Sequence, residues 1–329
     1  MKDEIMENVN EHIYLGTIIS ANGERFSEMN SRINKTNSVS NEIEQICKSP
    51  ELSLICLRYI KLLINSCLDG KLEYGCALWN VTKFKSSSDK LDRIKPNLLK
   101  HVLQIPASTP SAAVQYEFGI NNLVLDILME KVVLGVETLK LDDNRISKQI
   151  LKLMLEKKIP GFCTELIEAC TILGVSLDDL MNVRDVRNVL KKKVIEIQSS
   201  ELLMKMVLCS KMDRVILNGY SYDGKMKRYL SELNFYQARA IFMARYRMWP
   251  TKSNFPGRWP GTLCNICGLK DTDEHVLSCP GYADIVMGKI QYDMFWDNSV
   301  LDDMEKMNEI GDIVVAVVNR MELIQNFEV

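Results

Sequence analysis

Apolar residues recur every three or four positions over most of the chain, which is the period of an amphipathic helix. The first such run begins after Ser27, where Met29, Ile33 and Ile43 fall on one helical face. Residues 52–68 are apolar on nearly all sides, so we expect a buried helix there. The same period marks six later helices, at residues 91–105, 122–139, 146–157, 162–173, 186–198 and 235–248.

Local signals set the ends of several of these helices. Ser49 followed by Pro50 is a helix start, and Gly70 is expected to end the buried helix that follows. Pro106 and Pro110 exclude regular structure between them and indicate a linker. Ser176, with Asp179 three residues later, is an N-terminal cap for a further helix.

Only one segment has a strand pattern. Residues 13–15 and 17–19 are rich in apolar and β-branched side chains, and the turn residues Ala21, Asn22 and Gly23 follow them. A two-stranded hairpin is marginal by itself, so it must lean on the following helices or come from a larger sheet.

The strongest chemical signal is a Cys/His set near the C-terminus. Cys264, Cys267, His275 and Cys279 have the spacing Cys-x2-Cys-x7-His-x3-Cys. Zn²⁺ prefers four sulfur or nitrogen ligands in a tetrahedron, and Gly268 supplies the tight turn after the second cysteine. The pattern predicts one structural zinc ion with no open coordination position for chemistry.

The alternative interpretation is three unrelated thiols beside a surface histidine. The chain has 10 cysteines, but the other seven sit in apolar patterns and not in this register. A disulfide is disfavoured because nothing in the sequence indicates secretion. The predicted fold class is therefore mainly α, with one short N-terminal β-hairpin and a small C-terminal zinc knuckle.

A run of basic and aromatic residues immediately precedes the Cys/His set. Such runs bind nucleic acid when cations neutralise phosphates and aromatic rings stack on unpaired bases. The alternative is a solvated basic helix whose aromatic rings face inward. The candidate contacts to RNA or single-stranded DNA are Arg239, Arg245, Arg247, Lys252, Arg258 and Trp259.

The distribution of charge along the chain restricts where nucleic acid could bind. The 329 residues carry a net charge of −2, so only a local patch can attract nucleic acid. Residues 283–329 contain ten acids against three bases, which sets an acidic tail beside the basic run. No apolar run is long enough to span a membrane, and residues 1–16 do not resemble a signal peptide. We therefore expect the nucleus or cytoplasm, no membrane contact, and no secretion.

Three blocks together resemble the non-LTR (LINE-type) retrotransposon reverse transcriptases, downstream of the palm. The first joins Tyr14-Leu15-Gly16 to the helix with Arg32-Ile33. The second joins residues 72–79, LEYGCALW, to Pro106, Thr109-Pro110 and the segment EFGI at 117–120. The third runs from Arg247-Met248 and residues 254–258 into the Cys/His set. The resemblance implies a thumb-like region with the hairpin at residues 1–105, a helical linker region at 106–224, and a region at 225–329 that contains the basic helix, the CCHC knuckle and the acidic helical tail.

The departures from that family argue against an enzyme. Two-metal polymerases need paired aspartates, and the only similar segment, Tyr282-Ala283-Asp284, lacks the second one. The acidic tail also lacks a carboxylate–lysine cluster of the endonuclease kind. We therefore expect a catalytically inactive fragment that binds RNA or single-stranded DNA. The alternatives are an all-α interaction or scaffold protein with a purely structural zinc site, including one that self-associates, and a relic with no selected function.

Overall fold

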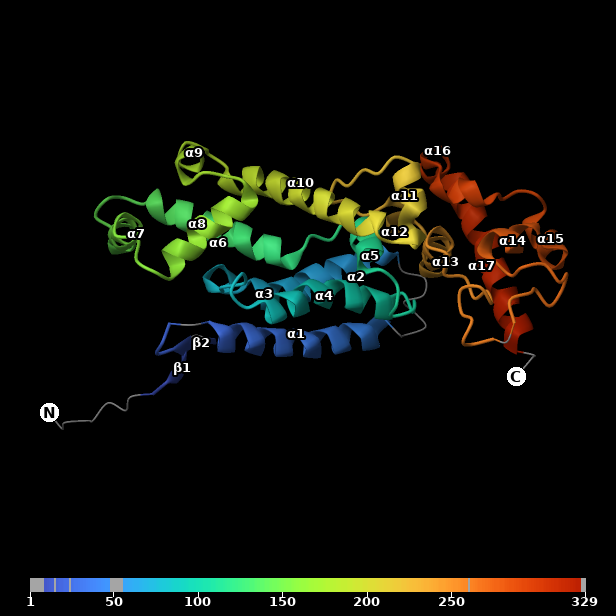
Figure 1. The fold of residues 1–329 in the computed structure, drawn as a ribbon, viewed down its shortest axis with the longest axis horizontal. Coiled ribbons are helices and arrows are strands. Elements are labelled where there is room, and N and C mark those ends of the chain that lie inside the picture. Colours follow the sequence, from blue (N-terminus) through green and yellow to red (C-terminus); the bar gives the residue numbers. More distant parts are fainter. Residues whose placement is uncertain (1–8, 15, 24, 48–55, 260, 327–329) are drawn as a thin grey trace. The chain divides into compact units, whose positions relative to one another are not determined.

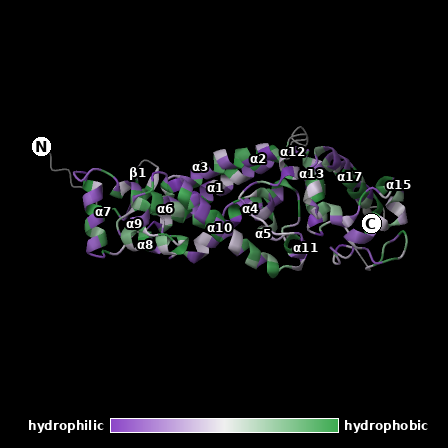
Figure 2. Ribbon diagram, turned by 90° about the horizontal axis from the view of Figure 1, so that it is seen from above, coloured by the Kyte–Doolittle hydropathy of each residue, from purple (hydrophilic) through white to green (hydrophobic). Residues whose placement is uncertain are grey.

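The computed structural model describes residues 9–14, 16–23, 25–47, 56–259 and 261–326 (Figure 1). The described chain is mainly helical, with a two-stranded antiparallel hairpin near its N-terminus, as the sequence predicts. Hydrophilic and hydrophobic residues alternate along the helices, as expected for elements with one buried face (Figure 2). The predicted helix start at Ser49 and Pro50 lies outside the described residues.

The chain divides into two compact units, each built from three separate segments. Unit 1 contains Met1–Glu42, Ile64–Lys95 and Asn121–Gln198, and unit 2 contains Ile43–Leu63, Pro96–Ile120 and Ser199–Val329. The predicted regions 1–105, 106–224 and 225–329 are consecutive stretches of sequence, drawn from a resemblance and not from contacts in space. Their boundaries therefore stay a prediction.

Unit 1 holds the hairpin and a group of helices. Its elements are β1 Glu11–Tyr14, β2 Thr17–Ser20, α3 Gly70–Glu73, α6 Leu123–Leu139, α7 Ile146–Glu156, α8 Phe162–Leu173 and α9 Leu177–Met181. The division between the units falls within α1 Phe26–Cys47, α2 Leu57–Ile64, α4 Lys85–Val102 and α10 Val186–Val207.

The remaining helices belong to unit 2. They are α5 Ser111–Phe118, α11 Asp213–Leu217, α12 Arg228–Glu232, α13 Phe235–Arg245, α14 Asp273–Ser278, α15 Ala283–Val286, α16 Asn298–Leu301 and α17 Met304–Asn326.

The hairpin leans on α1 through one ion pair. Glu28 accepts hydrogen bonds from the Ile18 backbone N–H at 2.7 Å and from Arg32 Nε at 2.7 Å. Arg32 also donates to the Gly16 carbonyl oxygen at 2.9 Å. These hydrogen bonds connect both β2 and the turn at Gly16 to α1. A two-stranded hairpin, which is marginal by itself, is therefore stabilised by the helix that follows it.

The expected helix at residues 52–68 differs from the structure in two ways. Its described part buries one face only, since Ile60, Ile64 and Leu68 are buried whereas Leu62 is 58% exposed. Gly70 does not end it, because a π-helical turn at Asn65–Asp69 leads directly into α3, where Gly70 keeps right-handed helical backbone angles. Gly70 is exposed, and a Cβ atom at this position would meet no neighbouring atom within 4 Å.

In unit 2, α13 and α17 lie side by side (Figure 1) and approach closely at a glycine. A Cβ atom on Gly311 of α17 would lie 2.9 Å from both Cβ and Cγ of Gln237. Gln237 is held in place by its backbone N–H, which donates to Asn234 Oδ1 at 3.0 Å, and by its amide, which donates to Asp312 Oδ1 at 2.8 Å. Because Gln237 is fixed at both ends, it leaves no room for a larger residue at position 311.

Gly311→Leu should therefore separate α13 from α17. Overpacking of this kind lowers the free energy of unfolding by about 1–3 kcal/mol. Gly70→Leu is the matched control, since it makes the same change at an exposed helical glycine, where the higher helix propensity of leucine should leave the free energy of unfolding unchanged or raise it by up to about 1 kcal/mol. Urea denaturation of both variants measures the difference, and equal midpoints would contradict the close helix approach.

Candidate metal centre

The four predicted ligands come together in one cluster. The nearest distances join Cys264 Sγ to Cys279 Sγ at 3.8 Å, Cys267 Sγ to Cys279 Sγ at 3.8 Å, and Cys267 Sγ to His275 Nε2 at 3.2 Å. All four ligand atoms lie within 4.8 Å of one another. Among the described residues, this is the one group of three or more cysteine, histidine or acidic side chains arranged to hold a metal ion.

A tight turn positions the first two cysteines. The Gly268 N–H donates to the Cys264 carbonyl oxygen at 2.9 Å, and the Cys264 N–H donates to the Leu269 carbonyl oxygen at 2.6 Å. An isolated antiparallel bridge between Leu263 and Lys270 closes the loop. Gly268 has φ +76°, a conformation that favours glycine, which accounts for glycine directly after the second cysteine.

The short helix α14 positions the other two ligands. Thr272 caps it by accepting a hydrogen bond from the His275 N–H at 3.1 Å. Cys279 follows the last residue of α14 and is buried, one helical turn beyond His275. Turn and helix together direct three thiols and one imidazole at a common point.

The cluster fits a tetrahedral ion in its dimensions. Zinc–sulfur bonds of about 2.3 Å at tetrahedral angles place neighbouring sulfur atoms about 3.8 Å apart. A backbone hydrogen bond from Leu269 lowers the pKa of Cys267, whereas burial raises the pKa of Cys279 to about 12. Because metal ligands must be deprotonated, a dication would have to stabilise the buried Cys279 thiolate. The arrangement can hold a metal ion.

Two buried aspartates fasten residues 262–279, which we call the Cys/His segment, to the loop after α13. Asp273 Oδ1 accepts hydrogen bonds from the Trp249 N–H at 3.1 Å and from Asn254 Nδ2 at 3.1 Å. Asp271 Oδ2 accepts from the Lys252 N–H at 2.7 Å. The sequence interpretation missed both aspartates, although acids at two alternate positions inside a Cys/His loop were a visible signal.

The helix α13 does not present Arg245 at the surface, and that expectation is wrong. Arg245 is 5% exposed and Glu117 is fully buried, with Arg245 Nε and Nη2 each 3.0 Å from Glu117 Oε1. Tyr246 donates to the same oxygen at 2.6 Å, and the Arg245 guanidinium lies 4.4 Å from the centre of the Trp296 ring. A buried carboxylate takes up the charge, so Arg245 stabilises unit 2.

Two more of the candidate nucleic-acid contacts are buried. Lys252 is 6% exposed and donates to Asn265 Oδ1 within the Cys/His segment. Trp259 is 7% exposed and packs edge-to-face against Phe255 at 5.9 Å between ring centres. Both side chains are used inside the fold, so the expectation that they face solvent is also wrong.

The other three candidates keep some exposure. Arg239 is half-buried and donates to the Leu103 carbonyl oxygen at 2.8 Å. Arg247 is half-buried and lies 3.6 Å from Asp213 and 3.9 Å from Glu274. Arg258 is exposed and lies 4.8 Å from the centre of the Trp259 ring. The candidates therefore do not form one continuous surface patch.

The Cys/His segment has an exposed surface that the sequence interpretation did not use. Leu263, Ile266 and Leu269 are 55%, 43% and 61% exposed, and Lys270 is exposed beside them. These residues flank the ligand turn in the sequence, and the Ile266 side chain also lies against Gly281. They give the segment an apolar and basic outer face, and exposed Arg258 lies just before the segment in the sequence.

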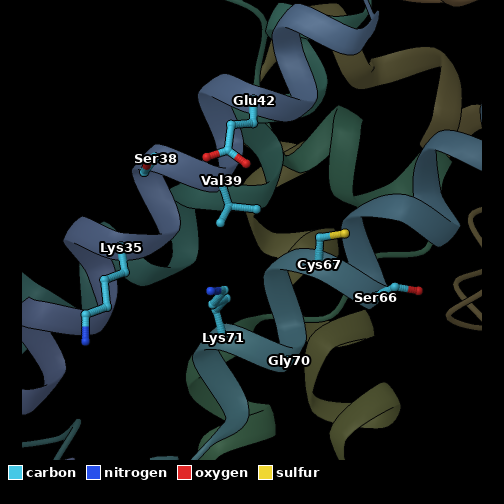
Figure 3. A pocket seen from close by; sticks show the side chains of 8 residues that line it. All are labelled: Lys35, Ser38, Val39, Glu42, Ser66, Cys67, Gly70 and Lys71. Atoms are coloured by element: carbon cyan, nitrogen blue, oxygen red, sulfur yellow. The ribbon is translucent and has the colours of Figure 1, made fainter. Parts of the chain in front are cut away.

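Unit 1 contains a separate polar groove (Figure 3). Its cavity of about 530 Å³ lies between α1, which contributes Lys35, Ser38, Val39 and Glu42, and the π-helical turn with α3, which contributes Ser66, Cys67, Gly70 and Lys71. Because its lining combines two lysines, a glutamate and a thiol, the groove does not indicate one class of ligand.

Comparison of the chain with protein-family models, with curated protein sequences and with solved structures gave no match. In the part of the chain that the structure describes, no helix has the length and apolar character needed to cross a membrane.

We expect one zinc ion per purified chain. Cys264→Ser/Cys267→Ser should lose it and unfold at lower temperature, because structural zinc sites contribute to folding. Metal analysis by mass spectrometry and thermal denaturation measure both effects. Cys163→Ser/Cys170→Ser is the matched control, since it removes two buried thiols outside the cluster. Equal metal content in the two double variants would contradict the site.

Arg245→Met should lower the free energy of unfolding by about 3–5 kcal/mol, because it leaves the Glu117 carboxylate buried without its partner. Arg247→Met is the control at a half-exposed arginine, and should cost less than about 1 kcal/mol. Urea denaturation measures both. Similar losses for the two variants would show that Arg245 is not in a buried pair.

Proposed function

We propose that the Cys/His segment is a zinc knuckle with a structural role. Three thiols and one imidazole at tetrahedral spacing support zinc, which favours such ligands in closed four-coordinate sites. With all four positions supplied by the protein, the ion would have no place for a substrate or a reactive water. It would fold the segment and hold α14 against the loop after α13.

We further propose that the chain is a catalytically inactive binding module that resembles the non-LTR reverse transcriptases downstream of their palm. Its ligand would be RNA or single-stranded DNA, bound at the outer face of the knuckle. The observation that carries this proposal is the pairing of the ligand cluster with exposed Arg258 and Lys270. Zinc knuckles are a recurrent RNA-binding module, and their contacts are to unpaired bases and phosphates.

The burial of Arg245, Lys252 and Trp259 narrows the contact set. Arg258 and Lys270 would meet phosphates, while Leu263, Ile266 and Leu269 would pack on base faces. Half-exposed Arg239 and Arg247 would add longer-range attraction. Phosphate contacts of this kind read no sequence and weaken with salt.

The second candidate is an all-α interaction or scaffold protein in which zinc only fastens the C-terminal helices. The burial of the basic side chains favours this candidate. Arg245 pairs with Glu117, and Lys252 donates a hydrogen bond to Asn265, so neither side chain is available to phosphate. In this case the exposed leucines and isoleucine of the knuckle would contact a protein. A relic with no selected function would bind neither.

Arg258→Glu/Lys270→Glu should weaken binding to a short single-stranded RNA and reduce the salt slope by about one unit per lost phosphate contact. Fluorescence anisotropy over a salt series measures both quantities. Lys205→Glu/Lys306→Glu changes the net charge equally at exposed lysines outside the knuckle and is the control. Equal affinity losses in the two variants would indicate overall charge alone, and no RNA binding by the native chain would favour the scaffold candidate.

A further inference from the structure

The three thiols of the Cys/His segment differ in their access to solvent. Cys264 and Cys279 are buried, whereas Cys267 is half-buried. Its two neighbours in the sequence, Ile266 and Gly268, are both exposed. Because the reactivity of a thiolate toward oxidants follows its exposure, Cys267 is the member of the cluster that a small oxidant from solvent meets first.

A second thiol lies next to Cys267 on the buried side of the cluster. The Cys279 Sγ atom is 3.8 Å from the Cys267 Sγ atom. The sulfur atoms of a disulfide are about 2.05 Å apart, so these two have to approach each other by less than about 2 Å. Cys264 lies equally near Cys279, at 3.8 Å, but both thiols of that pair are buried. Exposure and distance together single out Cys267 and Cys279.

We propose that the Cys/His segment is a redox-sensitive site, in which a hydroperoxide joins Cys267 to Cys279 in a disulfide and the zinc ion is released. This inference rests on the zinc knuckle proposed above and concerns the regulation of that same site. The oxidant is named by its chemical class, a hydroperoxide such as hydrogen peroxide.

The reaction has two steps. In the first, the Cys267 thiolate attacks the terminal peroxide oxygen, an S–O bond forms and the O–O bond breaks. Cys267 becomes a sulfenic acid, and the departing oxygen takes a proton from water. In the second, the Cys279 thiolate attacks the Cys267 sulfur, the S–S bond forms, and hydroxide leaves and is protonated. Overall, the two thiolates lose two electrons, and the peroxide takes up two electrons and two protons.

The disulfide removes two of the four zinc ligands. Zinc binds the thiolate form of cysteine, which the bridged sulfur atoms no longer supply. Only Cys264 and His275 would remain, in place of the four protein ligands of a structural zinc site. The ion therefore leaves, while the new bridge still joins the ligand turn to the residue after α14.

The effect of oxidation is confined to the ligand turn. Asp271 and Asp273 hold the Cys/His segment to the loop after α13 through hydrogen bonds that involve no cysteine. The segment therefore stays attached to unit 2, and the part that loses its ion is the turn that carries Leu263, Ile266 and Leu269. Because this turn is the surface proposed to meet RNA, RNA affinity should fall together with zinc content and return when the bridge is reduced.

Peroxide treatment of the zinc-loaded full chain tests the inference. Hydrogen peroxide should release the one zinc ion, which a chromogenic chelator measures, and dithiothreitol with added zinc should restore the zinc content. Trypsin cuts after Arg258, Lys270 and Lys289, so mapping without reductant should find residues 259–270 joined to residues 271–289. Fragmentation of the joined peptides should place the bond at Cys267.

The outcomes separate this inference from the proposal beneath it. A purified chain that holds no zinc before treatment would refute the zinc knuckle and this inference together. A zinc-loaded chain that keeps its zinc in peroxide, or that joins Cys264 to Cys279, would overturn this inference alone.

Cys267→His tests which thiol starts the reaction. The variant offers two thiols and two imidazoles, which is also a closed zinc set, and zinc release by peroxide should slow at least about tenfold because both remaining thiols are buried. Cys67→Ser is the control, since it removes an exposed thiol outside the cluster and should release zinc at the native rate. In the native chain, dimedone added during a brief peroxide exposure should trap the sulfenic acid at Cys267. Trapping at Cys264 or Cys279 instead would overturn the assignment, whatever the variant does.

Discussion

The C-terminal part of the chain depends on four side chains meeting at one point. Residues 262–279 contain one isolated bridge and a six-residue helix, and helices so short are not stable alone. Three of their large apolar side chains, Leu263, Ile266 and Leu269, face solvent. The segment therefore has little hydrophobic core of its own, and a shared ion would supply the order that burial does not.

Buried polar contacts hold this segment against the rest of unit 2. Asp271 and Asp273 fix it to the loop that follows α13. That helix is in turn fixed by Arg245, which pairs with Glu117 of α5 in a site closed by Tyr246 and Trp296. The basic run thus connects the Cys/His segment to the core of unit 2. Three of its six candidate nucleic-acid contacts, Arg245, Lys252 and Trp259, are buried because they make these internal contacts.

Local periodicity predicted most of the fold because it depends on short-range order. The bounds of α8 match the expected helix, and α6 and α7 differ by one residue. The ligand cluster was predictable for the same reason, since its four members lie within 16 residues. The burial of Arg245 could not be predicted from the local sequence, because its partner Glu117 is 128 residues away. Gly70 misled the prediction because glycine can also keep right-handed helical angles, as it does here between the π-helical turn and α3.

These features describe a helical protein whose C-terminal region contains a Cys/His cluster that can hold a metal ion. The most direct test of that account is X-ray absorption at the zinc edge of the purified chain. We expect one zinc ion bound by three sulfur atoms at about 2.3 Å and one nitrogen atom at about 2.0 Å. A zinc ion ligated mainly by oxygen, or a chain that holds no zinc while keeping its native fold, would contradict it.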